Sequence, residues 1–93
     1  MKYRVRFRSL ARADVRRELR RYGHEAPHMV ASFSEELDAV VASLEENPQI
    51  YQSVYRESRR ALMARFPYSI YFLVEENLVI VFAVVHQSRD DER

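Results

Sequence analysis

The sequence predicts a single α+β domain over residues 1–93, with its elements in the order β-α-α-β-β-β. Three features indicate this class. An alternating apolar and basic stretch opens the chain, two stretches with helical apolar spacing follow, and two apolar runs rich in β-branched and aromatic residues come last. This order predicts an antiparallel helical hairpin packed on a four-stranded, mainly antiparallel sheet. A chain of 93 residues has no room for a second core.

The first strand and the first helix are expected within the first 23 residues. Tyr3, Val5 and Phe7 alternate with arginines, which predicts a half-buried strand with one basic face. Apolar residues then recur at helical spacing over residues 11–22. Gly23, the only glycine of the chain, suits a left-handed stop just after this helix.

A second, longer helix is expected after a short link. Pro27 fits its first turn, and Asn47-Pro48 ends it, because the residue before a proline disfavours the helical conformation. Its apolar stripe comprises Val30, Phe33, Leu37, Val40, Val41 and Leu44.

The last part of the chain predicts a sheet. Residues 49–57 are less regular and are expected to form a loop with a strand beginning near Val54, and a strand from Arg60 leads to Pro67. Residues 66–74 and 78–85 then form a hairpin around a polar break. Alternation places Phe66, Tyr68, Ile70, Phe72 and Val74 on one face of the first strand, and Leu78, Ile80, Phe82 and Val84 on one face of the second. Since the opposite faces are apolar too, both strands are expected to be central and covered on both sides.

Composition excludes several kinds of site. The chain has no cysteine, so disulfides and thiolate chemistry are excluded. The three histidines form no zinc-binding pattern and a single glycine cannot build a phosphate loop, so neither a metal nor a cofactor is expected. The longest apolar run, residues 78–85, is too short to cross a bilayer, and a cytoplasmic location is expected.

The net charge of +1 conceals a segregation along the chain. Residues 1–21 carry nine Lys or Arg and a balance of +7, whereas residues 22–57 have a balance of −6. Two explanations are open. The basic first helix pairs with the acidic second helix, or it presents a basic surface to a nucleic acid or an acidic protein.

Cationic and aromatic residues gather in the predicted strands and at their ends. The cations are Arg59, Arg60, Arg65, His86 and Arg89, and the aromatic residues are Tyr68 and Tyr71. Such groups suit RNA phosphates and stacked bases, and His with Arg supports phosphodiester cleavage by acid–base catalysis and charge stabilisation. The ordinary alternative is that the arginines are solvated or paired and the tyrosines pack in the core.

From Arg59-Arg60-Ala61-Leu62 through Arg89-Asp90 the chain resembles the RelE/ParE superfamily of small bacterial toxins. The resemblance lies in the Pro67-Tyr68 strand start, the acidic turn and the His86-x-x-Arg89-Asp90 strand end. It implies the toxin of a type II toxin–antitoxin module, a plasmid-stabilisation or addiction system that inhibits growth. It also implies a cognate antitoxin as partner, DNA gyrase or the ribosome with its mRNA as target, and no membrane. A homodimer or a toxin–antitoxin hetero-oligomer is the implied assembly.

The branch of the superfamily depends on a few positions. RelE-like members cleave mRNA on the ribosome, and the resemblance then makes His86, Arg89 and Arg60 the catalytic candidates. Ser69 stands where that branch has an arginine, and no tyrosine follows Arg89. These departures favour a ParE-like protein without catalysis, which binds an essential target such as DNA gyrase. Its expected binding residues are Arg59, Arg60, Arg65, His86 and Arg89; a ribosome-dependent endoribonuclease is the alternative.

Overall fold

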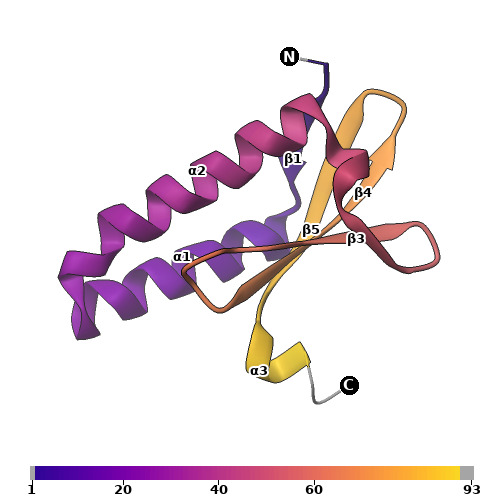
Figure 1. The fold of residues 1–93 in the computed structure, drawn as a ribbon. Helices are drawn as coiled ribbons and strands as arrows, with labels where there is room; N and C mark the ends of the chain where they lie inside the picture. The colour runs from indigo at the N-terminus through magenta and orange to yellow at the C-terminus, as the bar shows by residue number, and fades with distance from the viewer. Residues whose placement is uncertain (1, 91–93) are drawn as a thin grey trace.

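The computed structural model describes residues 2–90, with side chains through Ser88. In chain order the elements are β1 (Arg4–Phe7), α1 (Ser9–Glu25), the 3-10 turn η1 (Pro27–Met29), α2 (Val30–Glu46), η2 (Pro48–Ile50), β2 (Gln52–Tyr55), β3 (Ser58–Leu62), β4 (Tyr68–Glu75), β5 (Leu78–His86) and the short α3 (Gln87–Asp90). The α+β class, the two long helices after the first strand and the final meander of strands are confirmed (Figure 1).

The sheet has five strands, in the order β1-β5-β4-β3-β2, rather than the four expected. β1 runs parallel to β5, and the other neighbours are antiparallel, so the sheet is mainly antiparallel as predicted. The additional strand is β2, which contains Val54, where a strand start was expected; it pairs with β3 across the two-residue turn Arg56-Glu57. That turn holds Arg56 at a positive φ of 52°. Turns of this kind normally carry Gly or Asn, so residues 56 and 57 carry no sequence signal for a hairpin.

The first helix does not end at Gly23, contrary to the prediction. α1 continues to Glu25, and the amide of Ala26 closes it by donating to the carbonyl of Tyr22. Gly23 has no positive φ, so it is an ordinary residue of the last helical turn. The 3-10 turn η1, which begins at Pro27, reverses the chain between the two long helices instead.

Gly23→Ala is expected to stabilise the protein by about 0.5–1 kcal/mol. Alanine gives the unfolded chain fewer conformations than glycine does, so less conformational entropy is lost when the helix forms. A Cβ at this position would meet no atom within 4 Å, so the substitution has room. Urea denaturation measures the change. A fall in stability would show that the glycine is required by the fold.

A bulge in β5 decides which of its residues enter the core. Tyr71 pairs with Ala83 and Phe72 with Val81, so Phe82 is an extra residue on β5. The alternation therefore shifts within the strand. Val79 and Val81 before the bulge and Val84 after it are buried on the helix side. The expectation that Leu78, Ile80, Phe82 and Val84 share one face was wrong, because it assumed an unbroken period of two.

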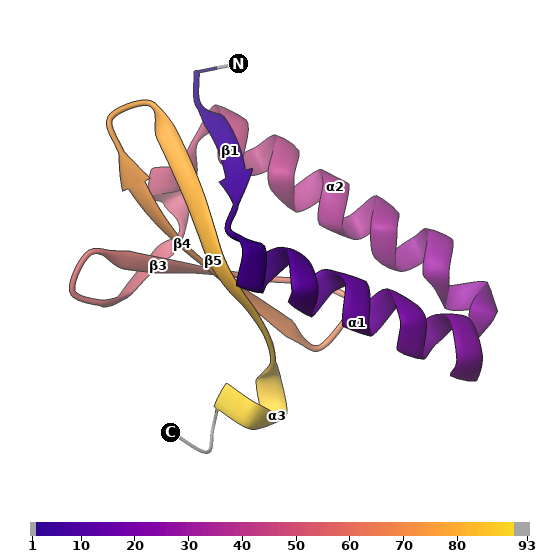
Figure 2. The same ribbon diagram turned by 180° about the vertical axis from the view of Figure 1, so that it is seen from behind.

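Both long helices lie on the same side of the sheet (Figures 1 and 2). They cover the face of β4 that carries Tyr68, Ile70 and Phe72, all with no exposed surface, as the sequence predicted. An aromatic cluster joins the helices to the sheet. The centre of the Phe33 ring on α2 lies 5.3–5.5 Å from the ring centres of Tyr22, Phe66 and Tyr68. This cluster fixes the helical hairpin against the end of the sheet where β4 begins.

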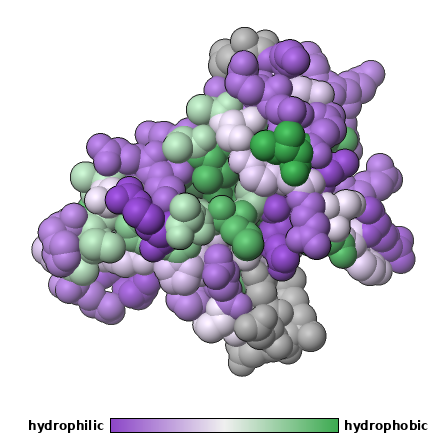
Figure 3. Space-filling model, viewed as in Figure 1, coloured by the Kyte–Doolittle hydropathy of each residue, from purple (hydrophilic) through white to green (hydrophobic). Residues whose placement is uncertain are grey.

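Neither long helix covers the opposite side of the sheet, which we call the open face (Figures 1 and 2). By register and period it carries Arg60, Leu62, Tyr71, Leu73, Ile80 and Phe82. Most of these side chains are half-buried among one another, and Leu62 is 54% exposed. The view of Figure 3 shows apolar side chains gathered in patches towards the middle of the molecule, with polar side chains around them.

Candidate target-binding site

Arg60 is the predicted cation that the sheet presents on the open face. It lies opposite Tyr71 in the β3–β4 register, and its Nη2 lies 3.5 Å from the side-chain oxygen of Gln52 on β2. The ring of Tyr71 lies 6.2 Å from that of Phe82. Arg60 and the Tyr71–Phe82 ring pair therefore share one face of three neighbouring strands, an arrangement of a cation and aromatic side chains that suits recognition of a partner.

Arg59 and Arg65 are committed to the fold. The Nη1 of Arg59 donates to the carbonyl oxygens of Tyr51, at 2.7 Å, and Gln49, at 3.3 Å, and so ties β3 to η2 and to the residue that follows it. Glu36 of α2 accepts the backbone amide of Arg65 at 3.0 Å and forms an ion pair with its guanidinium at 3.6 Å. For these two residues the structure favours the ordinary explanation of paired arginines.

His86 lies at the other side of the sheet. It pairs with Tyr68 in the β4–β5 register, and its ring makes an edge contact with the Tyr68 ring at 5.3 Å. The amide of Ser88 donates to its Nδ1 at 3.2 Å, and the Ser88 hydroxyl lies 2.8 Å from the same nitrogen. Arg89 follows in α3, and its side chain lies outside the described residues.

The register separates the two described catalytic candidates. His86 shares the face of Tyr68, whereas Arg60 shares the face of Tyr71, and residues an odd number apart on one strand point to opposite faces. The sheet therefore lies between the imidazole and the guanidinium. An acid or base and a charge-stabilising group must both reach one phosphate, and these two side chains do not.

Tyr68 belongs to a buried polar network that the sequence analysis missed. Its hydroxyl donates to Glu18 at 2.5 Å and accepts from Arg21 at 2.8 Å, and Arg21 also donates to Glu18 at 3.0 Å. Glu18 is only 4% exposed. The sequence does contain an indication of this network. Glu18 continues the apolar helical spacing of Ala11 and Val15, and a carboxylate buried at such a position needs polar partners.

The network fixes the ionisation of its members. Burial opposes ionisation of Glu18, but hydrogen bonds from Tyr68 and Arg21 and the charges of Arg21 and Arg17 outweigh it and hold the pKa of Glu18 below its ordinary value. Burial first, and then the hydrogen bond to Glu18, raises the pKa of the Tyr68 phenol well above its ordinary value. Tyr68 therefore keeps its proton, which makes it unsuited to act as a base.

A second carboxylate, that of the partly buried Asp14, holds α1 against the sheet. β1 pairs with β5 only as far as Val81, and the amide of Val84, beyond that point, donates to Asp14 at 3.1 Å. Asp14 also pairs with Arg17 at 2.9 Å. Two carboxylates one helical turn apart thus connect α1 with β5 and with β4.

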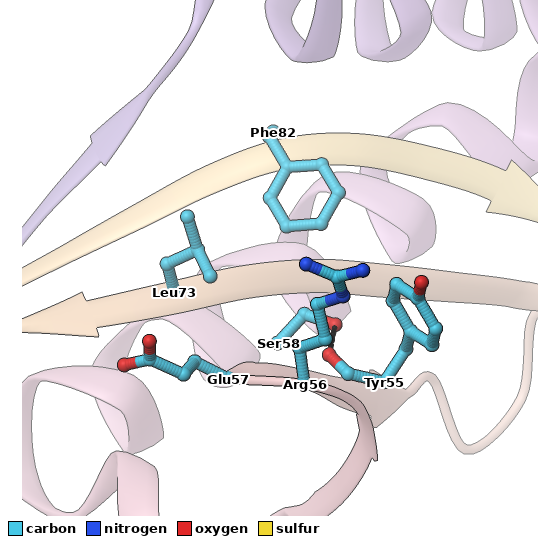
Figure 4. Close-up of a pocket in the computed structure, with 6 residues that line it drawn as sticks. All are labelled: Tyr55, Arg56, Glu57, Ser58, Leu73 and Phe82. Atoms are coloured by element: carbon cyan, nitrogen blue, oxygen red, sulfur yellow. Dashed lines mark hydrogen bonds between the residues drawn. The ribbon is translucent and has the colours of Figure 1, made fainter.

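An apolar groove opens on the open face beside the β2–β3 turn (Figure 4). Leu73 and Phe82 form one side of it and residues 55–58 the other, with a volume of about 380 Å³. The guanidinium of Arg56 lies over the ring of Tyr55 at 5.2 Å from its centre, so one wall is both cationic and aromatic. The groove extends the surface around Arg60 towards the end of the hairpin.

Ser69 is fully buried, between its strand neighbours Leu62 and Val85. Within the described part of the chain its hydroxyl has no hydrogen-bond partner. A position with no exposed surface has no space for an arginine in this packing. The departure noted in the sequence is therefore built into the core of the sheet.

Among the side chains that the structure describes, those of residues 2–88, no group of three His, Asp or Glu residues could hold a metal ion. No helix in this range is long and apolar enough to span a membrane.

Comparison with known proteins gives a family and a fold. A family model described as the ParE toxin of the type II toxin–antitoxin system parDE matches residues 5–91. The structure is similar to a chain of the chromosomal ParDE toxin–antitoxin system from P. aeruginosa, with a TM-score of 0.77 and 16% sequence identity. The alignment covers 91% of this chain and 96% of that chain. A search of curated protein sequences found no match.

Proposed function

We propose, from the premise that this chain belongs to the ParE toxin family of type II toxin–antitoxin systems, that it inhibits growth by binding an essential target, DNA gyrase. A cognate antitoxin, encoded beside it, neutralises the toxin by binding it. The toxin acts by occupying its target and carries out no cleavage of RNA itself.

This proposal rests on the separation of Arg60 from His86 by the sheet. The two side chains lie on opposite faces of the sheet, and Tyr68 is locked in its protonated form by the Glu18 network. General acid–base cleavage of RNA needs its groups within hydrogen-bond reach of one phosphodiester. A toxin that acts by binding has no such requirement.

The open face supplies the binding surface. Arg60 stands beside Tyr71 and Phe82, and Leu62 of the same strand is 54% exposed. Interfaces depend on a few aromatic, aliphatic and arginine side chains that become buried on binding, and contiguous apolar surface rimmed by polar groups marks such sites. We assign the gyrase-binding surface to this part of the sheet.

The double variant Arg60→Ala/Leu62→Ala is expected to inhibit gyrase at least tenfold less well than the wild type, because it removes a charge and an apolar anchor from the open face. The measurement is inhibition of DNA supercoiling by purified gyrase, with accumulated DNA breaks as the second readout. The matched control, Lys2→Ala/Ile50→Ala, removes a cation and an exposed aliphatic residue elsewhere and should inhibit like the wild type.

Two outcomes would contradict the proposal. One is equal loss of inhibition in the control and in the double variant. The other is strong codon-phased cleavage of a translated message, measured by primer extension with the wild-type toxin, which would establish the endoribonuclease alternative. Addition of the adjacent gene product to the supercoiling assay should restore gyrase activity.

A further inference from the structure

The structure divides the arginines of the first helix into two sets. Arg17 and Arg21 are engaged with acidic residues of the same helix: Arg17 lies 2.9 Å from Asp14, and Arg21 lies 3.0 Å from Glu18. Arg21 also reaches Glu25 at 3.2 Å. These contacts lie within α1, so pairing with the acidic second helix does not account for its charge.

The other set points to solvent. Arg8, Arg12, Arg16 and Arg20 are all exposed, and none of them forms an ion pair within the described part of the chain. We call these four residues the arginine stripe. Arg12, Arg16 and Arg20 recur every fourth residue of α1, so successive positions are about 6 Å apart along the helix and share one side of it, and Arg8 directly precedes the helix. The positive charge of these four arginines is therefore not neutralised by acidic residues of the described chain.

The stripe continues onto the sheet. Arg6 of β1 and Arg12 of α1 line one hollow of about 580 Å³, together with Val5 and Phe7. Figure 2 shows α1 in front of the rest of the fold, with β1 leading directly into it. The cationic surface thus runs from the outer edge of the sheet along the outer side of the helix.

We infer that the arginine stripe binds the phosphate backbone of duplex DNA. Phosphates along one DNA strand rise 3.4 Å per base pair, so two steps advance about 7 Å, close to the spacing of the stripe. A protein partner would need apolar or aromatic anchors in its interface. Among the large apolar side chains of α1 only Leu10 is strongly exposed, so this surface lacks such anchors and fits a polyanion better.

A DNA duplex fits the stripe better than an RNA duplex does. The major groove of B-DNA is about 12 Å wide and admits the side of a helix, whereas the major groove of A-form RNA is narrow. The buried Glu18 contact and the partly buried Asp14 contact hold α1 on the sheet, so the backbone positions of the stripe keep a fixed arrangement. Such contacts carry no sequence information, so the expected binding is non-specific.

The test is fluorescence anisotropy with a labelled 20-base-pair DNA duplex and the full-length toxin, in the absence of gyrase. With four phosphate contacts, the slope of log affinity against log salt should be about −3 to −4. Binding should therefore weaken about a hundredfold between 50 and 200 mM salt. Arg12→Gln/Arg16→Gln/Arg20→Gln should raise the Kd at 50 mM salt at least tenfold and bring the slope near −1.

Two controls separate the stripe from charge in general. Arg12→Lys/Arg16→Lys/Arg20→Lys keeps the charges and should keep the salt slope. Lys2→Gln/Arg65→Gln removes two exposed charges elsewhere and should bind DNA like the wild type. All of these positions are exposed, so circular-dichroism melts should show a folded protein in each case.

Three results would overturn the inference: no DNA binding by the wild type at 50 mM salt, equal weakening by both glutamine variants, or tighter binding to the matching RNA duplex. Loss of affinity for the antitoxin in the stripe variant, with DNA binding intact, would assign the stripe to an acidic protein instead. Gyrase is absent from this assay, so its result stands apart from that of the supercoiling test.

Discussion

Glu18→Ala is expected to destabilise the protein by about 3 kcal/mol, because it leaves the Tyr68 hydroxyl and the Arg21 guanidinium without their buried acceptor. For a domain of this size that corresponds to a fall in Tm of about 12 °C or more. Thermal melting at pH 7 measures the change. Since Glu18 also fixes the position of α1, the variant should be the least stable of the charge substitutions in that helix.

Glu25→Ala is the matched control. Glu25 pairs with the same arginine at 3.2 Å, but its side chain is 64% exposed. Exposed ion pairs contribute roughly 0–1 kcal/mol, so this variant should melt close to the wild type. Equal costs for the two glutamates would show that burial of Glu18 adds nothing to its interactions.

The same network predicts a pH dependence. The pKa of Glu18 in the folded protein lies below the ordinary value of 4.5, so its ionised form stabilises the fold. This contribution is complete above about pH 4.5 and is lost as the pH falls through the folded-state pKa. The Glu18→Gln variant has no carboxyl group to titrate at this position. The difference in free energy of unfolding between wild type and variant should therefore narrow from pH 7 towards pH 3. A constant difference over that range would contradict the assignment.

Phe33→Ala is expected to cost about 3–5 kcal/mol, the range for removing a buried phenylalanine ring. Phe33 has no exposed surface, and its ring contacts those of Tyr22, Phe66 and Tyr68. Loss of the ring leaves a cavity between α2 and the sheet that the stiff aromatic neighbours fill only in part. Urea denaturation gives the change in the free energy of unfolding.

Leu10→Ala controls for the loss of an apolar side chain as such. Leu10 is 76% exposed, so its truncation should change stability by less than about 0.5 kcal/mol. Leu37 on α2, which packs against the core while partly buried, should give an intermediate cost on truncation to alanine. A Phe33 variant as stable as the Leu10 variant would mean that the aromatic cluster does not hold the helical hairpin on the sheet.

Much of the fold was predictable because its signals are local. The helical spacing around Phe33 and Leu44 and the period of two in β4 depend on residues close in the chain, and both led to the correct buried faces. The pairing of β2 with β3 and the bulge at Phe82 were not predictable in this way. An arginine at positive φ makes the β2–β3 turn without the usual Gly or Asn, and a bulge depends on the partner strand.

The candidate site was predictable as a set of residue types and not as an arrangement. The sequence alone determined the class of fold, the layer of helices and the family resemblance, because these follow from periodicity and from a motif continuous in the chain. Only the tertiary structure decided that Arg60 and His86 face opposite ways, that Glu18 is buried, and which arginines of α1 stay unpaired. The physical reason is that strand register and helix packing bring together residues 47–70 positions apart, as in the Arg21–Tyr68 and Asp14–Val84 contacts.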